Sequence, residues 1–599
     1  MKLTIFFPLL TALLILLFYS ALPDLRQCVL PQRRPAGSRR AARAEALAVA
    51  LVTLLYTLFA FTHLGDRSAP QTSHCFYEGE SVTLELDGTC DVKRAMAYSV
   101  IGTGGYTLAL SADGVSWIDA AELEQDYVAL LKWHELSLEG SARYVRLTAW
   151  GRPELGSLTL FGADGAALPW RTASELSDEQ AITPAKPNFL NSSYFDEIYH
   201  ARTALEHLRG ISPYEISHPP LGKLIIGLGM TLFGVTPFGW RFMGTLFGAA
   251  MLPLVYAFAR KLFGRGSVAV CCTLLLAADF MHFNQSRIAT IDTYGVFFTL
   301  AMYYFMFRWL FPAEDGAHSS ARTEGGRLSL ALAGLCFGLG AACKWTCLYA
   351  GAGLGLLWLL HWVFRLAREK ERALLDLGRN ILFCLVFFVA LPALIYYLSY
   401  YPYGVAKGLG RGPGLFFSGD YLHTVLDNQS YMFRYHSGVD ATHPYSSRWY
   451  QWLLDIRPIL YYLDYEGASR SSFGAFVNPV LCWAGLLGLF VLLFCALFRR
   501  DRRALFLLVA YLAQLVPWMF ISRITFAYHY FPCAAFLTLV LGYVFSLLRD
   551  NTRLWRLSVW GLTGLCAALF LFFCPALRGA YLDTKTASLL YRWLPTWPF

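Results

Sequence analysis

Long apolar runs separated by short polar segments dominate the sequence. A helix needs about 20 consecutive apolar residues to cross the hydrocarbon core of a bilayer. Runs close to that length occur at 3–22, 44–63, 238–260, 267–281, 292–311, 328–343, 345–364, 381–400, 478–498, 504–520, 528–547 and 557–574. This pattern predicts a polytopic α-helical membrane protein with about twelve transmembrane helices.

The first run, 3–22, is predicted to be a retained transmembrane helix. It lacks a convincing basic leader, and a basic loop follows it where a signal peptide would have a small-residue cleavage site.

Residues 68–185 follow a different pattern, in which apolar and polar positions alternate over short runs such as SVTLEL and YTLALS. Turns rich in Gly and Asp separate these runs, which predicts a small antiparallel β-sandwich. The order of YTLALSADGVSW, RYVRLTAW and LTLFGADG resembles a discoidin-like jelly roll.

The composition excludes a soluble protein. Only 15% of the residues are charged, against about 25% in soluble domains, and the mean hydropathy is +0.43. The net charge of +9 comes from basic clusters in loops between apolar runs, which is the positive-inside pattern of a membrane protein. The expected partner is therefore the lipid bilayer, and no nucleic acid is expected.

The basic loops also predict an orientation. Arginines at 33–43 place the first loop in the cytoplasm, so residues 64–237 are external, and the later strongly basic loops then fall on the cytoplasmic side. The short apolar run 221–235 lies between prolines. If it crossed the membrane, the later basic loops would all lie outside the cytoplasm. We therefore expect it to be a surface or re-entrant helix on the outer face.

Most of the 14 cysteines lie within apolar runs, where they act as small hydrophobic residues. Cys75 and Cys90 lie in the predicted exported stretch, which permits a disulfide, although two cysteines alone do not establish one. No cysteine or histidine spacing typical of zinc is present, so no metal site is predicted.

The densest ionisable cluster of the external region is NSSYFDEIYHARTALEHL, with adjacent carboxylates at Asp196 and Glu197. Neighbouring side chains on a helix or turn point about 100° apart, so the two cannot share one task. One could act as a base towards a cleft while the other orients or binds. The alternative is a solvated helix start capped by Asn191 or Ser192, with acids that favour the helix dipole.

Cations are predicted to gather at the same outer depth. In HPPLGK, Lys223 either meets a phosphate at headgroup level or merely snorkels, with His218 before the double proline. Other ionisable residues lie where apolar runs should exclude them, which makes them candidates for a functional site: Arg241, Arg287, Asp292, Lys344, Arg523 and His529.

Such a combination suits transfer of a group from a lipid phosphate. A carboxylate can deprotonate an acceptor hydroxyl. Arginine and lysine can stabilise the charge that develops on a phosphate leaving group, while the bilayer holds an isoprenoid tail.

The segments FDEIYHARTALE, HPPLGKLIIGLG, GWRFMGTLFG, QSRIATIDTY, CKWTCLY and HPYSSRWYQW together resemble the protein O-mannosyltransferase family, glycosyltransferase family 39, in its bacterial form. The resemblance covers about 190–550. It implies a GT-C fold whose eleven core helices begin near residue 44, with the first helix as an addition.

The resemblance also implies roles for individual residues. Asp196 is expected to be the catalytic base and Glu197 to help bind or orient the acceptor, while Arg241, Lys223 and His218 are expected at the donor phosphate. The remaining candidates are expected to shape the site: Arg287, Asp292, Lys344, His443, Arg523 and His529. The expected reaction inverts the sugar and needs no tightly held metal, although a divalent cation, used by some GT-C relatives, remains an option.

The expected organisation has six parts: an added helix and basic loop (1–43), the first core helix (44–63), the β-sandwich (68–185), the catalytic core (186–400), an external loop (401–477) and the C-terminal helices (478–599). Eukaryotic members carry a MIR domain where this chain has only the 401–477 loop. The expected donor is a polyprenyl-phosphate sugar, with mannose implied by family, used at the outer face of a bacterial plasma membrane. The acceptor is expected to be protein Ser or Thr, with a cell-wall glycan or another lipid as alternatives.

Two other classes of function remain as alternatives. A glycolipid transporter or flippase would show inverted repeats with charges at mid-depth, and the sequence shows no repeat. A membrane-anchored glycan-binding protein would use the β-sandwich but leave the outer charged residues without a role.

Overall fold

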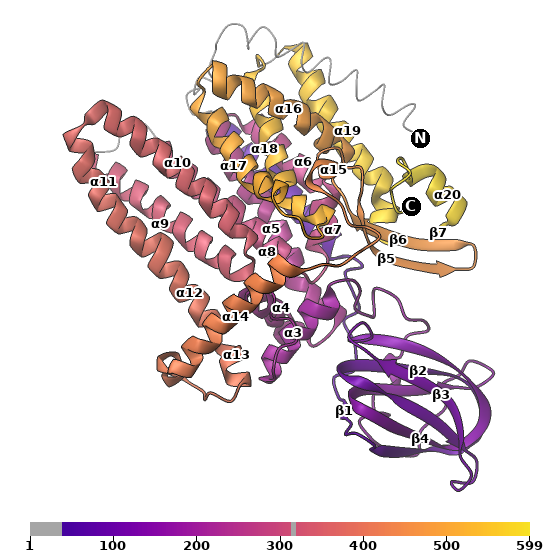
Figure 1. The fold of residues 1–599 in the computed structure, drawn as a ribbon. Helices are drawn as coiled ribbons and strands as arrows, with labels where there is room; N and C mark the ends of the chain where they lie inside the picture. The colour runs from indigo at the N-terminus through magenta and orange to yellow at the C-terminus, as the bar shows by residue number, and fades with distance from the viewer. Residues whose placement is uncertain (1–38, 313–318, 551) are drawn as a thin grey trace. The chain divides into compact units, whose positions relative to one another are not determined.

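The computed structural model describes residues 39–312, 319–550 and 552–599 (Figure 1). The predicted helix at 3–22 lies outside these residues. The chain divides into two compact units. The β-bearing unit comprises His63–Glu215 and Lys223–Met243, and the helical unit comprises the described residues up to Thr62, together with Ile216–Gly222 and Gly244–Phe599.

The β-bearing unit contains an antiparallel sheet with the strand order β1-β4-β2-β3. Its strands are β1 (His74–Cys75), β2 (Ser81–Ser111), β3 (Ile118–Gln125) and β4 (Lys132–Phe161). The middle of β2 pairs with β4 twice, because Met96 lies opposite both Glu135 and Thr159. The long strands therefore fold back on themselves, as Figure 1 shows, and enclose a buried apolar core. The antiparallel β-structure predicted within 68–185 is present, and its discoidin-like character stays a prediction.

Cys75 and Cys90 are both free thiols in this sheet, so the structure does not contain the disulfide that the compartment would permit. Cys75 is exposed and Cys90 is partly buried.

Two helices complete the β-bearing unit. Helix α3 (Glu197–Arg209) ends at Gly210, whose φ of 68° is left-handed. Arg209 of α3 donates two hydrogen bonds to the Glu154 carboxylate of β4, at 2.9 and 2.8 Å, and so fastens the sheet to the helix. Helix α4 (Leu221–Phe233) has 13 residues and is about 20 Å long, too short to cross a bilayer core of about 30 Å.

The helical unit contains the long apolar helices, whose bounds agree with the predicted runs. They are α2 (Arg39–Phe61), α5 (Pro237–Phe263), α6 (Gly266–Ala277), α7 (Phe280–Ser286), α8 (Asp292–Leu310), α9 (Ser319–Cys343), α10 (Thr346–Glu369), α11 (Glu371–Cys384), the π-helix η2 (Leu385–Ala390), α12 (Leu391–Ser399), α16 (Pro479–Phe498), α17 (Arg502–Met519), α18 (Phe531–Leu547) and α19 (Arg553–Leu577). The first seven residues of α5 belong to the β-bearing unit.

The predicted total of twelve transmembrane helices is not confirmed. Within the described ranges, eight helices are long and apolar enough to cross a membrane, or nine if the bent pair of α6 and α7 counts as one span. Helices α8 and α17 are not among them; they begin with charged residues, Asp292 and Arg502. The protein is an integral membrane protein whose helices are partly shorter and more polar than a simple count of runs predicts.

The run predicted at 267–281 is a broken helix, since α6 and α7 meet at an angle of 59°. Asp279 ends the first helix and caps the second. Its carboxylate accepts from the amide of His282 at 2.9 Å and from the amide of Asn478 at 2.9 Å. A carboxylate that accepts hydrogen bonds from backbone amides in this way stabilises a break in the helix within the membrane, where an unpaired amide would be costly.

The 401–477 segment, predicted to be an external loop, contains regular secondary structure. It contains α13 (Tyr401–Ala406), the 3₁₀-helix η3 (Pro413–Phe417), α14 (Gly419–Gly438), α15 (Trp449–Trp452) and the hairpin β5 (Ile459–Glu466) and β6 (Ser469–Ala475). The chain ends with β7 (Leu582–Asp583), which pairs with β6, and α20 (Thr584–Tyr591). Tyrosines from 400–421 form a small apolar core among α13, η3 and α14.

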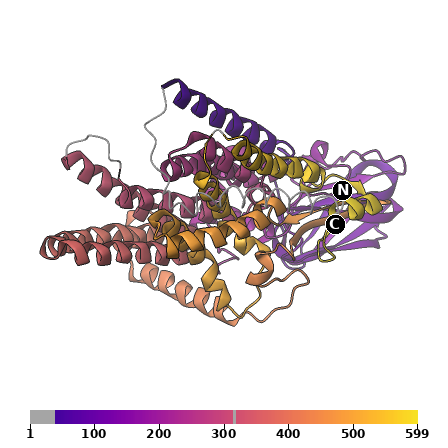
Figure 2. The ribbon, with the colours of Figure 1, turned by 90° about the horizontal axis from the view of Figure 1, so that it is seen from above.

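Helices α9 to α12 lie together at one side of the helical unit (Figures 1 and 2), and α10 packs against α17. Gly334 of α9 lies against η2, where an added Cβ would overlap the carbonyl oxygen of Phe387. A π-helix leaves its backbone locally irregular, and the missing side chain lets α9 approach it closely.

We expect Gly334→Val to destabilise the protein by about 1–3 kcal/mol, because the added side chain must push α9 away from η2. A lower midpoint of thermal unfolding of the detergent-purified protein would show it. Gly355→Val on α10 is the matched control, since an added Cβ there meets nothing within 4 Å. Equal midpoints for the two variants would contradict the close approach.

Candidate active site

Asp196 lies at the N-terminal boundary of α3, in a segment with an unusual backbone. Phe195, immediately before it, has a φ of 50°, a left-handed conformation that a bulky residue rarely adopts. Such a conformation persists only where surrounding contacts enforce it. The contacts of Ser192, Ser193 and Glu197 supply that enforcement.

Glu197 and Arg241 form a buried ion pair behind this segment. Arg241 Nε donates to Glu197 Oε1 at 2.7 Å, and Nη2 donates to Oε2 at 2.7 Å. Both side chains are 0% exposed. Arg241 also donates to the carbonyl oxygens of Ser192, at 2.9 Å, and Leu64, at 3.0 Å. One guanidinium therefore fixes both ends of the segment that carries Asp196.

The sheet fixes the same segment through the connection between β3 and β4. The amide of Ser193 donates to the Leu131 carbonyl at 2.8 Å, and its hydroxyl donates to the Leu130 carbonyl at 2.6 Å. The amide of Trp133 donates to the Ser192 hydroxyl at 3.1 Å. The β domain is thus hydrogen-bonded directly to the residues before Asp196.

These contacts argue against a solvated helix start at the Asp-Glu pair. A solvated helix start would expose Asn191, Ser192 and Glu197, and all three are buried, Glu197 completely. Asp196 is the N-cap residue of α3, and its side chain makes no capping hydrogen bond. Glu197 is turned into the protein while Asp196 is only half-buried, so the two carboxylates differ in environment as expected.

Lys223 is buried rather than snorkelling, with 1% of its side chain exposed. Its ammonium donates to the Glu215 carbonyl oxygen at 2.7 Å and forms an ion pair with the Glu215 carboxylate. Burial lowers the pKa of Lys223, and the Glu215 carboxylate opposes that shift. In the structure, the Lys223 ammonium is therefore paired with an acidic side chain of the protein itself.

The helical unit brings several predicted cations together, at the ends of its helices. Lys344, in the break between α9 and α10, pairs with Asp292, the first residue of α8, at 2.6 Å. Its ammonium lies 5.5 Å from the centre of the Tyr528 ring. We call His218, Lys344, His436, Arg523 and His529 the cation cluster.

His436 of α14 is the member that sequence reasoning missed. Its ring lies 5.1 Å from that of His218 and 6.2 Å from that of Trp345, and its Nε2 lies 2.8 Å from the Ser217 carbonyl oxygen. Burial, helped by the positive charges of His218, Arg523 and Lys344, lowers the pKa of His436 to about 4. His436 is therefore neutral near pH 7 and surrounded by cations.

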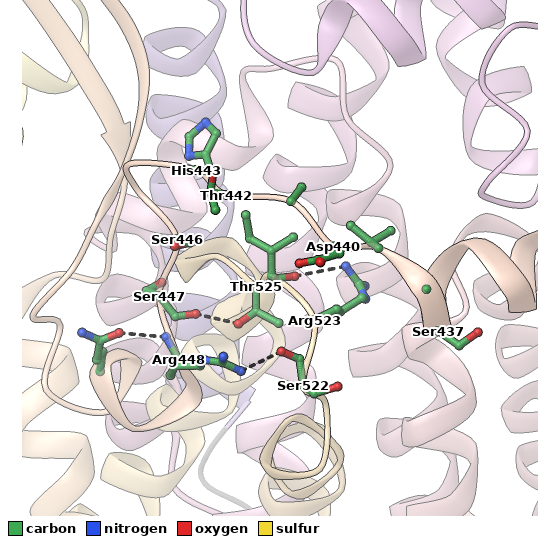
Figure 3. Close-up of a pocket in the computed structure, with 15 residues that line it drawn as sticks. Ser437, Asp440, Thr442, His443, Ser446, Ser447, Arg448, Ser522, Arg523 and Thr525 are labelled. Atoms are coloured by element: carbon green, nitrogen blue, oxygen red, sulfur yellow. Dashed lines mark hydrogen bonds between the residues drawn. The ribbon is translucent and has the colours of Figure 1, made fainter.

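A polar cavity of about 610 Å³ adjoins this cluster through Arg523 (Figure 3). Its walls come from 437–451 and 522–525. The Ser447 amide donates to the Thr525 carbonyl at 2.8 Å, and Arg448 donates to the Ser522 carbonyl at 3.0 Å, so the two walls are held together. In Figure 3, His443 lies at the far end of the cavity from Arg448.

Arg287 lies elsewhere, whereas His529 lies beside Lys344 in the cation cluster. Arg287 donates to the carbonyl oxygens of Ala60, at 3.0 Å, and Thr62, at 3.1 Å, beyond the C-terminal turn of α2. The structure thus places it with α2 rather than with the cation cluster. His529 is 7% exposed and packs against Trp452 and Trp518. It lines a small cavity together with Lys344 and Asp292.

Among the residues that the structure describes, no group of three His, Cys, Asp or Glu side chains could hold a metal ion. The expectation that no tightly held metal is needed stays a prediction.

Two family models match the chain. One, described as dolichyl-phosphate-mannose-protein mannosyltransferase, matches residues 181–403, and the other, the C-terminal four-helix region of protein O-mannosyltransferase, matches 421–597. The first range contains Asp196, Arg241 and Lys344, and the second contains His436 and Arg523. The candidate residues of each unit thus lie within matched residues.

Curated relatives and a solved structure agree with these matches. The polyprenol-phosphate-mannose–protein mannosyltransferase of Mycolicibacterium smegmatis is 27% identical over 73% of this chain and 94% of its own length. The enzyme of that name from Mycobacterium tuberculosis is 25% identical over 67% of this chain and 86% of its own. The Saccharomyces cerevisiae protein O-mannosyltransferase Pmt1–Pmt2 complex, solved with its sugar donor, has a TM-score of 0.58 at 14% identity, over 68% of this chain and 90% of its own. That likeness shows a shared fold.

We expect Arg241→Met to destabilise the protein by about 3–5 kcal/mol, because Glu197 is left buried without its partner. The double variant Arg241→Met/Glu197→Leu should recover much of that loss, because neither charge then remains. Thermal unfolding of the purified protein measures both.

Arg260→Met is the matched control on the same helix. Arg260 pairs with Glu45 at 3.2 Å, and both are partly exposed, so its loss should cost only about 0–1 kcal/mol. An equally small effect at Arg241 would contradict the buried pair.

Proposed function

The chain belongs to the dolichyl-phosphate-mannose-protein mannosyltransferase family and has its GT-C fold, and we propose that it transfers mannose from a polyprenyl phosphate to a hydroxyl group of a protein. The observation that carries this proposal is the immobilised segment Ser192–Glu197, which holds a half-buried carboxylate at a family-matched position. The mycobacterial relatives supply the class of donor and of acceptor.

In the proposed reaction Asp196 is the general base. Its carboxylate takes the proton of the acceptor hydroxyl while the hydroxyl oxygen forms a bond to C1 of mannose. The bond between C1 and the phosphate oxygen breaks, and its electron pair leaves with the polyprenyl phosphate. Attack opposite the leaving group inverts the configuration at C1, as the family resemblance implies.

The cation cluster is the proposed site of the leaving phosphate. Burial lowers the pKa of His436, and the nearby Lys344, Arg523 and His218 add to that shift. The Lys344 and Arg523 side chains supply positive charge at this point. Negative charge develops on the phosphate as C1 departs, and fixed positive groups stabilise that charge most where water is excluded. Asp292 holds the Lys344 ammonium in place by its ion pair.

For Arg241 and Lys223, the contacts support a positioning role in place of the expected phosphate contact. Arg241 is occupied by Glu197 and by two backbone carbonyls. Lys223 is occupied by Glu215, just before the HPP segment that carries His218. We propose that Arg241 orients the Asp196 segment and that Lys223 fixes the start of α4.

We further propose that the protein resides in a bacterial plasma membrane, with Asp196 and the β-sheet outside the cytoplasm. The basic loops of the sequence support this orientation. A polyprenyl carrier at the outer leaflet would then deliver mannose to proteins after their export.

We expect Asp196→Asn to lower mannose transfer by about 10²–10⁴-fold, because an amide cannot accept the hydroxyl proton. Transfer from polyprenyl-phosphate mannose to a Ser/Thr peptide, followed by the gain of one hexose in mass, measures it. Asp119→Asn, on an exposed position of β3, is the control and should retain full activity. Wild-type turnover by Asp196→Asn would remove the proposed base.

We expect binding of the donor at pH 5.5 to be accompanied by proton uptake at His436. Without donor, the His436 imidazole is neutral above about pH 4. A phosphate anion beside it raises the pKa of His436, so donor binding takes up protons at pH values between the pKa of the free enzyme and that of the complex. The change is measured by calorimetry in buffers with different ionisation enthalpies. Because His218, Arg523 and Lys344 also face this ring, the proton uptake due to His436 is the difference between the wild type and His436→Gln. Equal proton uptake by the variant and the wild type would contradict the phosphate site.

A further inference from the structure

Three tyrosines of the β-bearing unit form a row beside the Asp196 segment. Tyr199, in the first turn of α3, lies between Tyr127, which follows β3, and Tyr214, which follows α3. Its ring centre is 6.2 Å from that of Tyr127, at an interplanar angle of 21°, and 6.4 Å from that of Tyr214, at 4°. The rings are therefore nearly parallel and evenly spaced although they come from three separate segments.

Both outer tyrosines are held by short-range contacts. Tyr127 lies in a turn in which the Asp126 carboxylate accepts from the amides of Val128, at 2.9 Å, and Ala129, at 3.1 Å. The amide of Tyr214 donates to Glu206 of α3 at 2.6 Å. The Arg202 guanidinium covers the Tyr214 ring at 3.9 Å. The row is thus preorganised, which lowers the entropic cost of binding a ligand.

The row belongs to the same fixed framework as Asp196. Tyr199 lies three residues after Asp196, and residues three apart lie on one face of a helix. The connection that carries Tyr127 is the one whose Leu130 and Leu131 carbonyls hold Ser193. A ligand on the row would therefore lie within about one helical turn of the proposed base.

The exposure of these residues marks a binding surface rather than a core. Tyr127 is 43% exposed and Tyr214 is 46% exposed, and the nearby Val128, Leu208 and Ile211 are also exposed. Aromatic and apolar side chains exposed together are typical of interaction sites.

From this geometry we infer that the tyrosine row binds the acceptor polypeptide in an extended conformation next to the hydroxyl that receives mannose. This inference rests on the proposed function. Alternate residues of an extended chain point to the same side and are about 6.4–6.8 Å apart, which is close to the spacing of the rings. Successive side chains on one side of the peptide can then contact successive tyrosines.

The arrangement of the rings favours a polypeptide over a glycan. A sugar stacks on an open aromatic face. Here Tyr199 is stacked between its neighbours, and Arg202 covers Tyr214. Ring edges of the exposed Tyr127 and Tyr214 face the ligand, and these suit apolar side chains.

The test compares a long and a short acceptor with the full-length enzyme. For Tyr127→Ala/Tyr214→Ala we expect the KM for a ten-residue Ser/Thr peptide to rise about tenfold or more, the size of effect that truncated interface aromatics produce, with little change in kcat. A blocked Ser or Thr amide lacks the neighbouring residues that would contact Tyr127 and Tyr214, so its turnover should stay close to the wild-type level. Tyr77→Ala, at a tyrosine of the same unit that is 66% exposed, is the matched control.

An unchanged KM for the long peptide would overturn the inference. So would an equal loss on both acceptors, because the row would then act by positioning Asp196. Weaker inhibition by free mannan oligosaccharides, with an unchanged peptide KM, would reassign the row to glycans. Tyr127→Ala alone repeats the test if the double variant fails to fold.

Failure of the proposed function can be told apart from failure of this inference, because the wild type itself would then transfer no mannose. Binding of a fluorescent ten-residue peptide, followed by anisotropy, then still compares the wild type with the variant. Equal affinities in that assay would overturn the inference independently.

Discussion

The buried ion pair between Arg241 and Glu197 is the interaction on which the proposed catalytic segment depends. Two charges without water are costly unless each is neutralised and hydrogen-bonded, and here the bidentate geometry and two backbone carbonyls meet that requirement. The same guanidinium thereby fixes Ser192 and Glu197 on either side of the strained Phe195. A base held this firmly keeps its position when the acceptor arrives, which is the condition for rapid proton transfer.

The β-sheet belongs to the same set of contacts. The connection between its strands β3 and β4 bonds to Ser192 and Ser193, and Glu154 of β4 holds Arg209 at the other end of α3. Both ends of the helix that begins at Asp196 are therefore fastened to the β domain. The domain can present a binding surface, the tyrosine row, in a constant relation to the proposed base, because both rest on one rigid set of contacts.

Helix ends and breaks supply the polar groups of the helical unit. Lys344 lies where α9 gives way to α10, Asp292 begins α8, and Asp279 caps the bend between α6 and α7. Continuous apolar helices leave no place for such groups within a membrane, whereas a break that lines a protein interior can hold them with their partners. The cation cluster forms because several helices end at one region of this unit.

Local sequence determined the apolar helices, the β character of 68–185, the ionisable residues of both halves of the site and the family resemblance. Hydrophobic run length and period-two alternation act over a few neighbouring residues and can be read directly. Only the tertiary structure decided that Glu197 pairs with Arg241, 44 residues away, and that Lys223 pairs with Glu215. It also decided that Arg287 donates hydrogen bonds to the end of α2. His436 joins the cation cluster from α14, a helix that no apolar run predicted. Pairings of this kind depend on which distant segments pack together, because the cost of a buried charge falls only when its partner is actually in place.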